Sequence, residues 1–215
     1  MNMRTLPIAA AAAGAALALA AGCAGFHSNE AVTQTYVLRE SARHAGAAAP
    51  ADAAVATAAA GAAPTATLQV LRPLAAPGLD TDQIALLRDT QRLDYFSASR
   101  WPAPLPDLLQ TLAIDALRAA GHYRAVQPDA TAFVADQVLQ IEIRHCEVEY
   151  SPEGSPVVHV QLLATLGQRA DRTLVASVVA GSSKPAAANR MQAVVAAFQE
   201  AVGDALDQLA SRLGP

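Results

Sequence analysis

Several residue types and motifs are scarce or missing in this 215-residue chain, and each absence argues against a particular class of structure or function. The only cysteines are Cys23 and Cys146, so no disulfide framework is expected. Lysine occurs once, at Lys184, and the formal net charge of −4 gives no basic face for nucleic acid. The chain also lacks Gly-x-Ser-x-Gly, a Gly-rich phosphate loop, Cys-x-x-Cys and His-Glu-x-x-His. We therefore expect no catalytic residues, no metal and no cofactor.

Only one long apolar run is present, and it lies at the N-terminus, from Ile8 to Ala21. The run follows the positively charged Arg4 and is shorter than the roughly 20 apolar residues that are needed to cross a bilayer. Both features are typical of a signal peptide. Gly22 is the small residue expected before a lipid-accepting Cys23, although Leu19 lies one position further from Cys23 than is usual. The pattern predicts a lipoprotein signal peptide over residues 1–22 and a lipid on Cys23. A plain secretory signal or a buried Ala-rich helix are the alternatives.

The mature chain is long enough for one domain with a hydrophobic core. We expect residues 23–32 to form a polar tether and residues 33–215 to form a single domain. Residues 41–65 are mostly alanine, with few large apolar side chains to dock against a core. This composition predicts that the segment is a low-complexity insertion that forms a mobile loop. A loose helix is the alternative, because alanine favours helix.

Strand patterns dominate the chain outside two helical segments. Pro77-Gly78 indicates a turn. The patterns of residues 84–89 and 92–98 predict two strands that form a hairpin, although residues 80–88 also fit a helix. Near His145 the apolar residues change phase by one position, which predicts a β-bulge. The other expected strands are 33–40, 67–73, 138–150, 157–166 and 173–181.

Two segments show apolar residues at helical spacing. The first begins near Pro104 or Pro106, carries Asp107 in its first turn and ends at Gly121. The second, residues 191–213, has apolar residues at intervals of three and four. Short links between the strands imply antiparallel pairing. We predict an α+β fold, a twisted, mainly antiparallel sheet with two long helices packed on one face.

Few polar residues form a candidate site. His145-Cys146-Glu147 resembles a ligand triplet, but successive strand side chains point to opposite faces and cannot all bind one metal. A tight hairpin would place His159 near Val148, while Asp80 and Asp82 lie in a turn as expected for capping groups. The single tryptophan, Trp101, is interpreted either as an exposed contact for a partner or lipid or as an anchor of the proline-rich link over the core.

The order of these segments resembles a known family, the ABC-type transport auxiliary lipoproteins, which include the PqiC-like lipoproteins that accompany MCE proteins. The resemblance spans most of residues 33–213, and the Arg100-Trp101 pair before the first helix is its most telling feature. The other segments that carry it are the lipid-attachment motif over 19–23, Tyr36-Val37-Leu38, VLRPLAAPGL over 70–79, Arg92-Leu93-Asp94-Tyr95, PAPLPDLLQTL over 102–112 and the closing Ala/Leu helix.

The resemblance implies a non-enzymatic periplasmic subunit that docks onto an MCE-domain protein of an ABC transport system for phospholipid or other apolar molecules. Arg100 and Trp101 become candidate partner contacts, and a homo-oligomer is a further expectation. Ala24 after Cys23 favours the periplasmic face of the outer membrane, where acyl chains such as palmitate would hold the protein. The alternative is another envelope lipoprotein, either a structural assembly factor or a binder of a small apolar ligand.

Overall fold

A computed structural model describes residues 32–39, 64–88, 91–150 and 155–214. By its internal contacts the chain divides into Met1–Val32 and Thr33–Pro215, and the fold described is that of the second unit. The expected signal peptide, nearly all of the tether and nearly all of the Ala-rich insertion lie outside the described residues. The elements in chain order are β1 Gln34–Thr35, β2 Thr67–Val70, β3 Leu74–Ala75, β4 Gln83–Arg88, β5 Arg92–Arg100, α2 Leu105–Ala120, β6 Ala125–Pro128, β7 Gln137–Tyr150, β8 Val157–Gln168, β9 Leu174–Pro185 and α3 Met191–Arg212.

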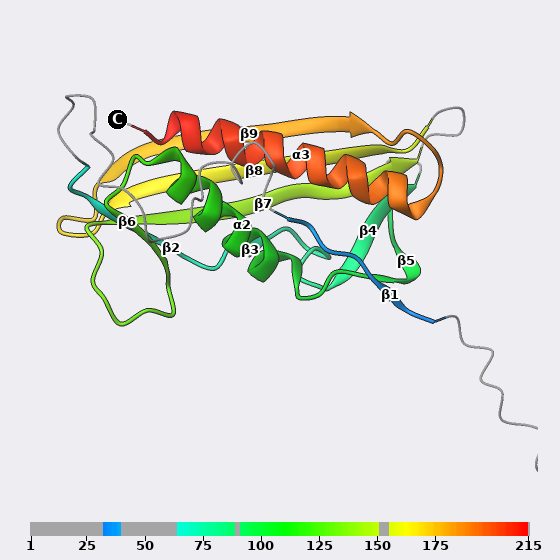
Figure 1. Ribbon diagram of the computed structural model, residues 1–215, viewed down its shortest axis with the longest axis horizontal. Helices are drawn as coiled ribbons and strands as arrows, with labels where there is room; N and C mark the ends of the chain where they lie inside the picture. The colour runs from blue at the N-terminus through cyan, green and yellow to red at the C-terminus, as the bar shows by residue number, and fades with distance from the viewer. Residues whose placement is uncertain (1–31, 40–63, 89–90, 151–154, 215) are drawn as a thin grey trace, which may run out of the picture. The chain divides into compact units, whose positions relative to one another are not determined.

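Strand β7 is the centre of the sheet. Along one edge it pairs antiparallel with β8 over nearly its whole length, and β8 pairs antiparallel with β9. Along the other edge lie three short consecutive strands, β2, β3 and β4, each parallel to β7. The chain therefore runs along β7 as one interrupted strand before it turns back into β5 (Figure 1).

The sheet is mixed but mostly antiparallel, and the α+β prediction is confirmed. The long ladders of β7, β8 and β9 and the β4–β5 hairpin are antiparallel. The parallel ladders are short and also join β1 to β5 and β6 to β2. For the parallel pairs with β6 and β7, the chain returns through α2, because a helical crossover brings the next strand back in the same direction, whereas β1 and β5 both precede α2.

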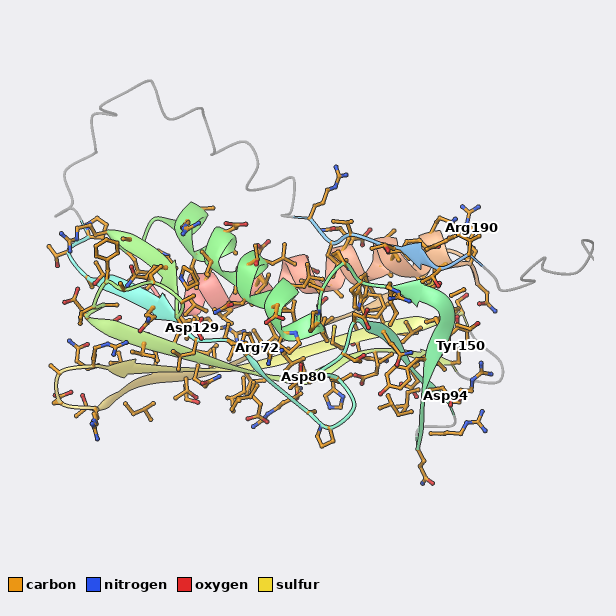
Figure 2. The ribbon with its side chains drawn as sticks, turned by 90° about the horizontal axis from the view of Figure 1, so that it is seen from below. Arg72, Asp80, Asp94, Asp129, Tyr150 and Arg190 are labelled. Atoms are coloured by element: carbon orange, nitrogen blue, oxygen red, sulfur yellow. The ribbon has the colours of Figure 1, made fainter. Side chains whose placement is uncertain are left out.

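Both helices cover the same face of the sheet, as Figures 1 and 2 show. Alternate residues of the strands supply the floor of the core, and the apolar stripes of α2 and α3 supply its roof. The largest fully buried side chains are Trp101, Phe198, Leu68, Ile84, Leu109, Leu117, Leu139, Ile141, Ile143, Leu162, Leu209 and Val70. Among the described residues, no helix combines the length and apolarity needed to cross a bilayer.

Helix α2 begins and ends as predicted. Pro104 precedes its first residue, and the N–H of Leu105, which has no partner within the helix, donates to the Thr81 carbonyl at 2.9 Å. Asp107 lies in the first turn, where a negative charge interacts favourably with the helix dipole. Gly121 ends the helix at φ 71°, a left-handed conformation that glycine adopts without steric cost.

The β-bulge near His145 is confirmed. Leu139, Ile141 and Ile143 face the core, the register with β8 shifts between Ile143 and His145, and Cys146 and Val148 then face the core. The extra residue in the bulge rotates the strand by one position, so that apolar residues stay buried on both sides of it.

The hairpin predicted for residues 84–89 and 92–98 is confirmed by the antiparallel pairing of β4 with β5, and the alternative helix over 80–88 is absent. Other expectations about local structure were wrong or incomplete. The strand expected over 33–40 is regular only at Gln34–Thr35, although the Tyr36 N–H still donates to the Arg100 carbonyl at 2.8 Å. Strands β3 and β6 were not predicted.

Candidate functional site

Arg100 and Trp101 are adjacent in sequence but have different environments. Trp101 is 2% exposed, and its ring packs edge-on against Phe198 of α3 with centroids 5.3 Å apart. Arg100 is half-exposed at the end of β5, where its Nη1 lies 3.6 Å from Asp82 Oδ2. The side chain of Trp101 therefore anchors the link to the core, and only Arg100 presents its side chain to the surface.

The two cysteines are also separated. Cys23 lies outside the described residues. Cys146 is a free, fully buried thiol on β7, and burial, with the adjacent Glu147 charge, raises its pKa far above the ordinary value. Cys146 therefore stays protonated and unreactive at neutral pH.

The bulge in β7 places His145 and Glu147 on the face of the sheet away from the helices. Glu147 is only 7% exposed, which is unusual for a carboxylate. Its Oε1 lies 2.7 Å from His145 Nδ1, and its Oε2 accepts the Cys146 N–H at 2.6 Å. The argument that His145, Cys146 and Glu147 cannot share a metal holds for Cys146, which faces the core, but His145 and Glu147 do meet.

A second chain of polar contacts crosses all three long strands. His159 of β8 lies between Glu149 of β7, 3.1 Å from Nε2, and Ser183 of β9, 2.8 Å from Nδ1. With its proton on Nε2, a neutral His159 donates to Glu149 and accepts from the Ser183 hydroxyl. His159 pairs with Glu147 in register, so its predicted position beside Val148 was wrong by one residue.

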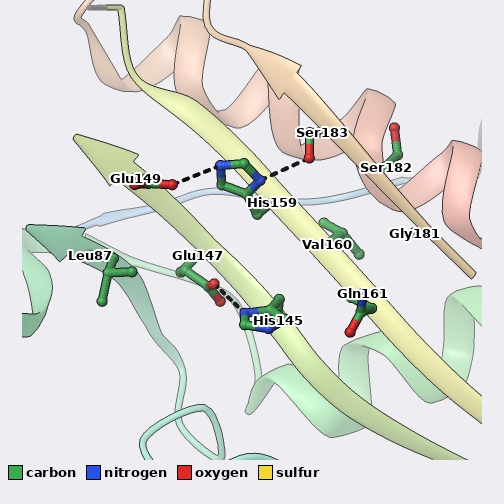
Figure 3. A pocket seen from close by; sticks show the side chains of 10 residues that line it. All are labelled: Leu87, His145, Glu147, Glu149, His159, Val160, Gln161, Gly181, Ser182 and Ser183. Atoms are coloured by element: carbon green, nitrogen blue, oxygen red, sulfur yellow. Dashed lines mark hydrogen bonds and ion pairs between the residues drawn. The ribbon is translucent and has the colours of Figure 1, made fainter. Parts of the chain in front are cut away.

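These residues line an open depression of about 590 Å³ on the helix-free face of the sheet (Figure 3). Its lining residues are Leu87, His145, Glu147, Glu149, His159, Val160, Gln161, Gly181, Ser182 and Ser183. Within the described ranges, no three His, Cys, Asp or Glu side chains lie close enough together to hold a metal ion. The depression presents imidazole and carboxylate groups that can form hydrogen bonds.

Asp80 and Asp82 do not cap a helix, contrary to the prediction. Each is paired with an arginine, Asp80 with Arg72 at 2.8 Å and Asp82 with Arg100. Figure 2 shows Arg72 beside Asp80. Arg72 also binds Asp107 of α2 at 2.6 Å, so it fastens the loop after β2 to the start of the helix. The hydrogen bond from Arg72 lowers the pKa of Asp80, and Asp80 in turn raises the pKa of Arg72.

Sequence reasoning missed the contacts of Glu149 and Ser183 with His159. Strand periodicity places Glu147 and Glu149 on one face of β7, but the contacts across β8 and β9 depend on the register of two hairpins. The first hairpin loop contains Pro152 and Pro156, and its geometry does not follow from a simple two-residue turn. The sequence therefore indicated the shared face of Glu147 and Glu149 on β7, but it did not indicate their partners on β8 and β9.

Comparison with known families identifies a match over most of the chain. The model of the ABC-type transport auxiliary lipoprotein component matches residues 48–210. Comparison with curated proteins found no match.

Comparison with solved structures shows the fold. The protein XCC0632 from Xanthomonas campestris is similar at a TM-score of 0.66 and 23% identity, over 82% of this chain and 92% of that one. A second, uncharacterized protein is similar at a TM-score of 0.55 and 11% identity, over 69% of this chain and 89% of that one. At these identities the similarity concerns the arrangement of the sheet and helices.

Proposed function

This chain belongs to the family of ABC-type transport auxiliary lipoprotein components, and from that premise we propose that it is a docking subunit of an MCE-type system. In this proposal the transport system moves lipid or another apolar molecule between membranes. The chain itself works by binding its partner, and another subunit hydrolyses ATP. The family match is the observation that carries the proposal.

The proposed anchor is a lipid on Cys23 after removal of residues 1–22. A single acyl chain gives only marginal membrane binding, whereas two or more chains give stable anchoring, at roughly 0.8 kcal/mol per buried CH₂. Ala24, rather than Asp, follows Cys23 and favours the outer membrane. The domain would then be held at the periplasmic face of that membrane.

The interior is filled around Trp101 and Phe198, which supports docking over enclosure of a ligand in the middle of the layer between the sheet and the helices. Trp101 and Phe198 pack against each other in this layer and are 2% and 0% exposed. In the described part of the chain, the opposite face of β7, β8 and β9 bears no helix (Figure 2) and carries the His145–Glu147 depression (Figure 3). An antiparallel sheet with one open face offers a surface for a partner.

We assign a partner contact to Arg100, with Trp101 as the buried support of the strand end that presents it. Arg100 is half-exposed and paired only loosely with Asp82. A guanidinium can form two parallel hydrogen bonds with a carboxylate on a partner.

Co-isolation tests the proposal. The lipoprotein, extracted with mild detergent, is expected to bring down an MCE-domain protein and to show no ATPase activity when purified alone. Arg100→Glu is expected to weaken recovery of the partner about tenfold, while Arg172→Glu, an equal charge change at the β8–β9 turn, leaves it unchanged. Recovery without any MCE-domain partner would overturn the proposal.

A further inference from the structure

A second hollow, of about 330 Å³, lies where both helices end over the sheet. Helix α2 ends at Ala120 and α3 at Arg212, so the layer between the helices and the sheet is open at this end. The residues that line the hollow are Ala66, His122, Tyr123, Gln137, Leu166, Val175, Ala176, Arg212, Leu213 and Gly214. Its size falls at the lower end of the roughly 300–1,000 Å³ range of small-molecule sites.

The floor of this hollow is the end of the hydrophobic core. Leu166 and Leu213 are 3% and 4% exposed, and both belong to the core cluster. Val175 is 51% exposed and Ala176 is half-buried beside it. An alkyl group in the hollow would therefore contact apolar side chains on several sides and would be withdrawn from water.

The polar groups of the hollow carry positive charge or donate hydrogen bonds. Arg212 donates from Nη1 to the Val179 carbonyl at 2.9 Å, and no ion pair joins it to an acid in the described part of the chain. His122 packs its ring over Gly214, where a Cβ atom would lie 2.7 Å from Nε2. Neither ring nitrogen of His122 has a hydrogen-bond partner among the described residues.

The hollow contains no carboxylate of its own. No Asp or Glu is among its lining residues, although the whole chain has 19 acidic and 15 basic residues. Tyr123 is neutral, because burial raises its pKa, and its hydroxyl donates to the Leu213 carbonyl at 3.1 Å. A positive charge beside an apolar floor, with no Asp or Glu among the described residues of the lining, is complementary to an anionic head on an alkyl chain.

We propose that this hollow binds the head and first methylenes of a single-chain amphiphilic anion. Arg212 pairs with the anionic head, His122 donates a second hydrogen bond to it, and the alkyl chain lies on Leu166, Val175 and Leu213. The head is either the carboxylate of a fatty acid or the phosphate of a monoacyl lipid. This site does not depend on an MCE partner, and its failure would leave the proposed docking function untouched.

Calorimetry with chemically defined amphiphiles tests the proposal. The mature chain from residue 23 on, with Cys23→Ser and exported behind a secretory signal that is cleaved without lipid attachment, is titrated with octanoate, decanoate and dodecanoate below their micelle concentrations. We expect saturable 1:1 binding whose Kd falls about threefold to fourfold per added methylene until the hollow is filled. Dodecyl phosphate replaces dodecanoate in a parallel titration, and the tighter of the two identifies the source of the head group.

Charge selectivity is the decisive readout. Dodecyltrimethylammonium, which has the same tail and the opposite charge, is expected to bind at least about tenfold more weakly than dodecanoate. Equal binding of the two amphiphiles, or no saturable binding of either anion, would overturn the proposal.

Variants locate the site. Arg212→Gln is expected to raise the Kd of dodecanoate about tenfold, whereas Arg190→Gln, the same change at the other end of α3, leaves it unaltered. If Arg212→Gln fails to fold, Val175→Asp is the substitute, because a negative charge at this exposed position of the wall repels the head. Wild-type affinity in a folded Arg212→Gln or Val175→Asp variant would place binding elsewhere and overturn the assignment.

Discussion

At the scale of single residues, Trp101 is the side chain whose loss should cost most. It fills the junction between the proline-rich link and α3 and packs against Phe198. Trp101→Ala is expected to lower the free energy of unfolding by about 3–5 kcal/mol, because it leaves a cavity in the core. Urea denaturation followed by circular dichroism measures this. The neighbouring Arg100→Ala is the control and should change stability by less than about 0.5 kcal/mol, and equal effects would contradict the anchoring role.

The hydrogen bonds of the Asp136 carboxylate predict how the stability of the fold changes as the pH falls into the acid range. The backbone N–H and the hydroxyl of Thr67 donate to its Oδ2 at 2.8 and 2.7 Å and lower its pKa. The folded state thus binds this proton less readily than the unfolded state, and the contribution to stability is present above about pH 4, the unfolded pKa. It is lost as the pH falls through the lower folded pKa.

Asp136→Asn should therefore flatten the acid limb of the stability profile. The amide keeps the shape of the side chain and removes its titration, so the urea midpoint of the variant should fall less between pH 5 and pH 2.5 than that of the wild type. An identical fall in both proteins would show that Thr67 and Asp136 do not set the acid response.

At the scale of elements, the free edge of β9 is partly covered by α3. Gln208 donates to the Gly181 carbonyl at 3.0 Å and accepts the Gly181 N–H at 3.4 Å, and Arg212 binds the Val179 carbonyl. Gly181 allows close strand packing, since a Cβ atom there would lie 2.8 Å from the Val160 carbonyl oxygen. The amide of Gln208 thus takes the place of a neighbouring strand and prevents edge-to-edge association.

Gln208→Leu should expose this edge. The variant leaves the Gly181 N–H and C=O without their partner, and Leu174, Val175 and Val179 already expose apolar surface on the same strand. Sedimentation velocity is expected to show concentration-dependent self-association beyond that of the wild type under the same conditions. Gln192→Leu adds an equal apolar side chain to an exposed position of the same helix and serves as the control. Self-association of both variants alike would argue against a protective role of Gln208.

Long elements with strong patterns were predictable from the sequence, and short strands were not. The bulge near His145 followed from a phase change within one strand, and α2 followed from Pro104, Asp107 and Gly121, so both depend on local signals. Strands β3 and β6 contain two and four residues. Their pairing with β7 and β2 depends on neighbours far away in the sequence, which no local pattern encodes.

The candidate site was predicted less completely than the fold for the same reason. The same-face position of His145 and Glu147 could be read from β7 once the bulge was expected. The contact of His159 with Glu149 and Ser183 requires the register of two hairpins, and an error of one residue changes every partner. The burial of Trp101 depended on Phe198, almost a hundred positions later in the chain.

At the scale of the whole molecule, the proposed function separates anchoring from docking. The compact unit Thr33–Pro215 contains the sheet, both helices and both hollows, and Cys23 precedes it. A change at Cys23 should therefore leave the stability of this unit and its intrinsic affinity for a partner unchanged. It should alter only the local concentration of the domain at the membrane, on which avidity depends.

Cys23→Ser is the corresponding prediction. The variant, exported behind a secretory signal that is cleaved without lipid attachment, is expected to move from the membrane fraction to the soluble periplasmic fraction, to unfold at the same urea concentration and to bind a purified partner with unchanged Kd, while recovery of the complex from cells falls. Cys146→Ala, the control at the other cysteine, should show the reverse, because it removes a buried side chain and leaves the anchor. Mass spectrometry of the wild type checks the premise directly. Residues 1–22 still attached, or an unmodified Cys23 thiol, would leave the domain without its proposed anchor and the transport role without its location.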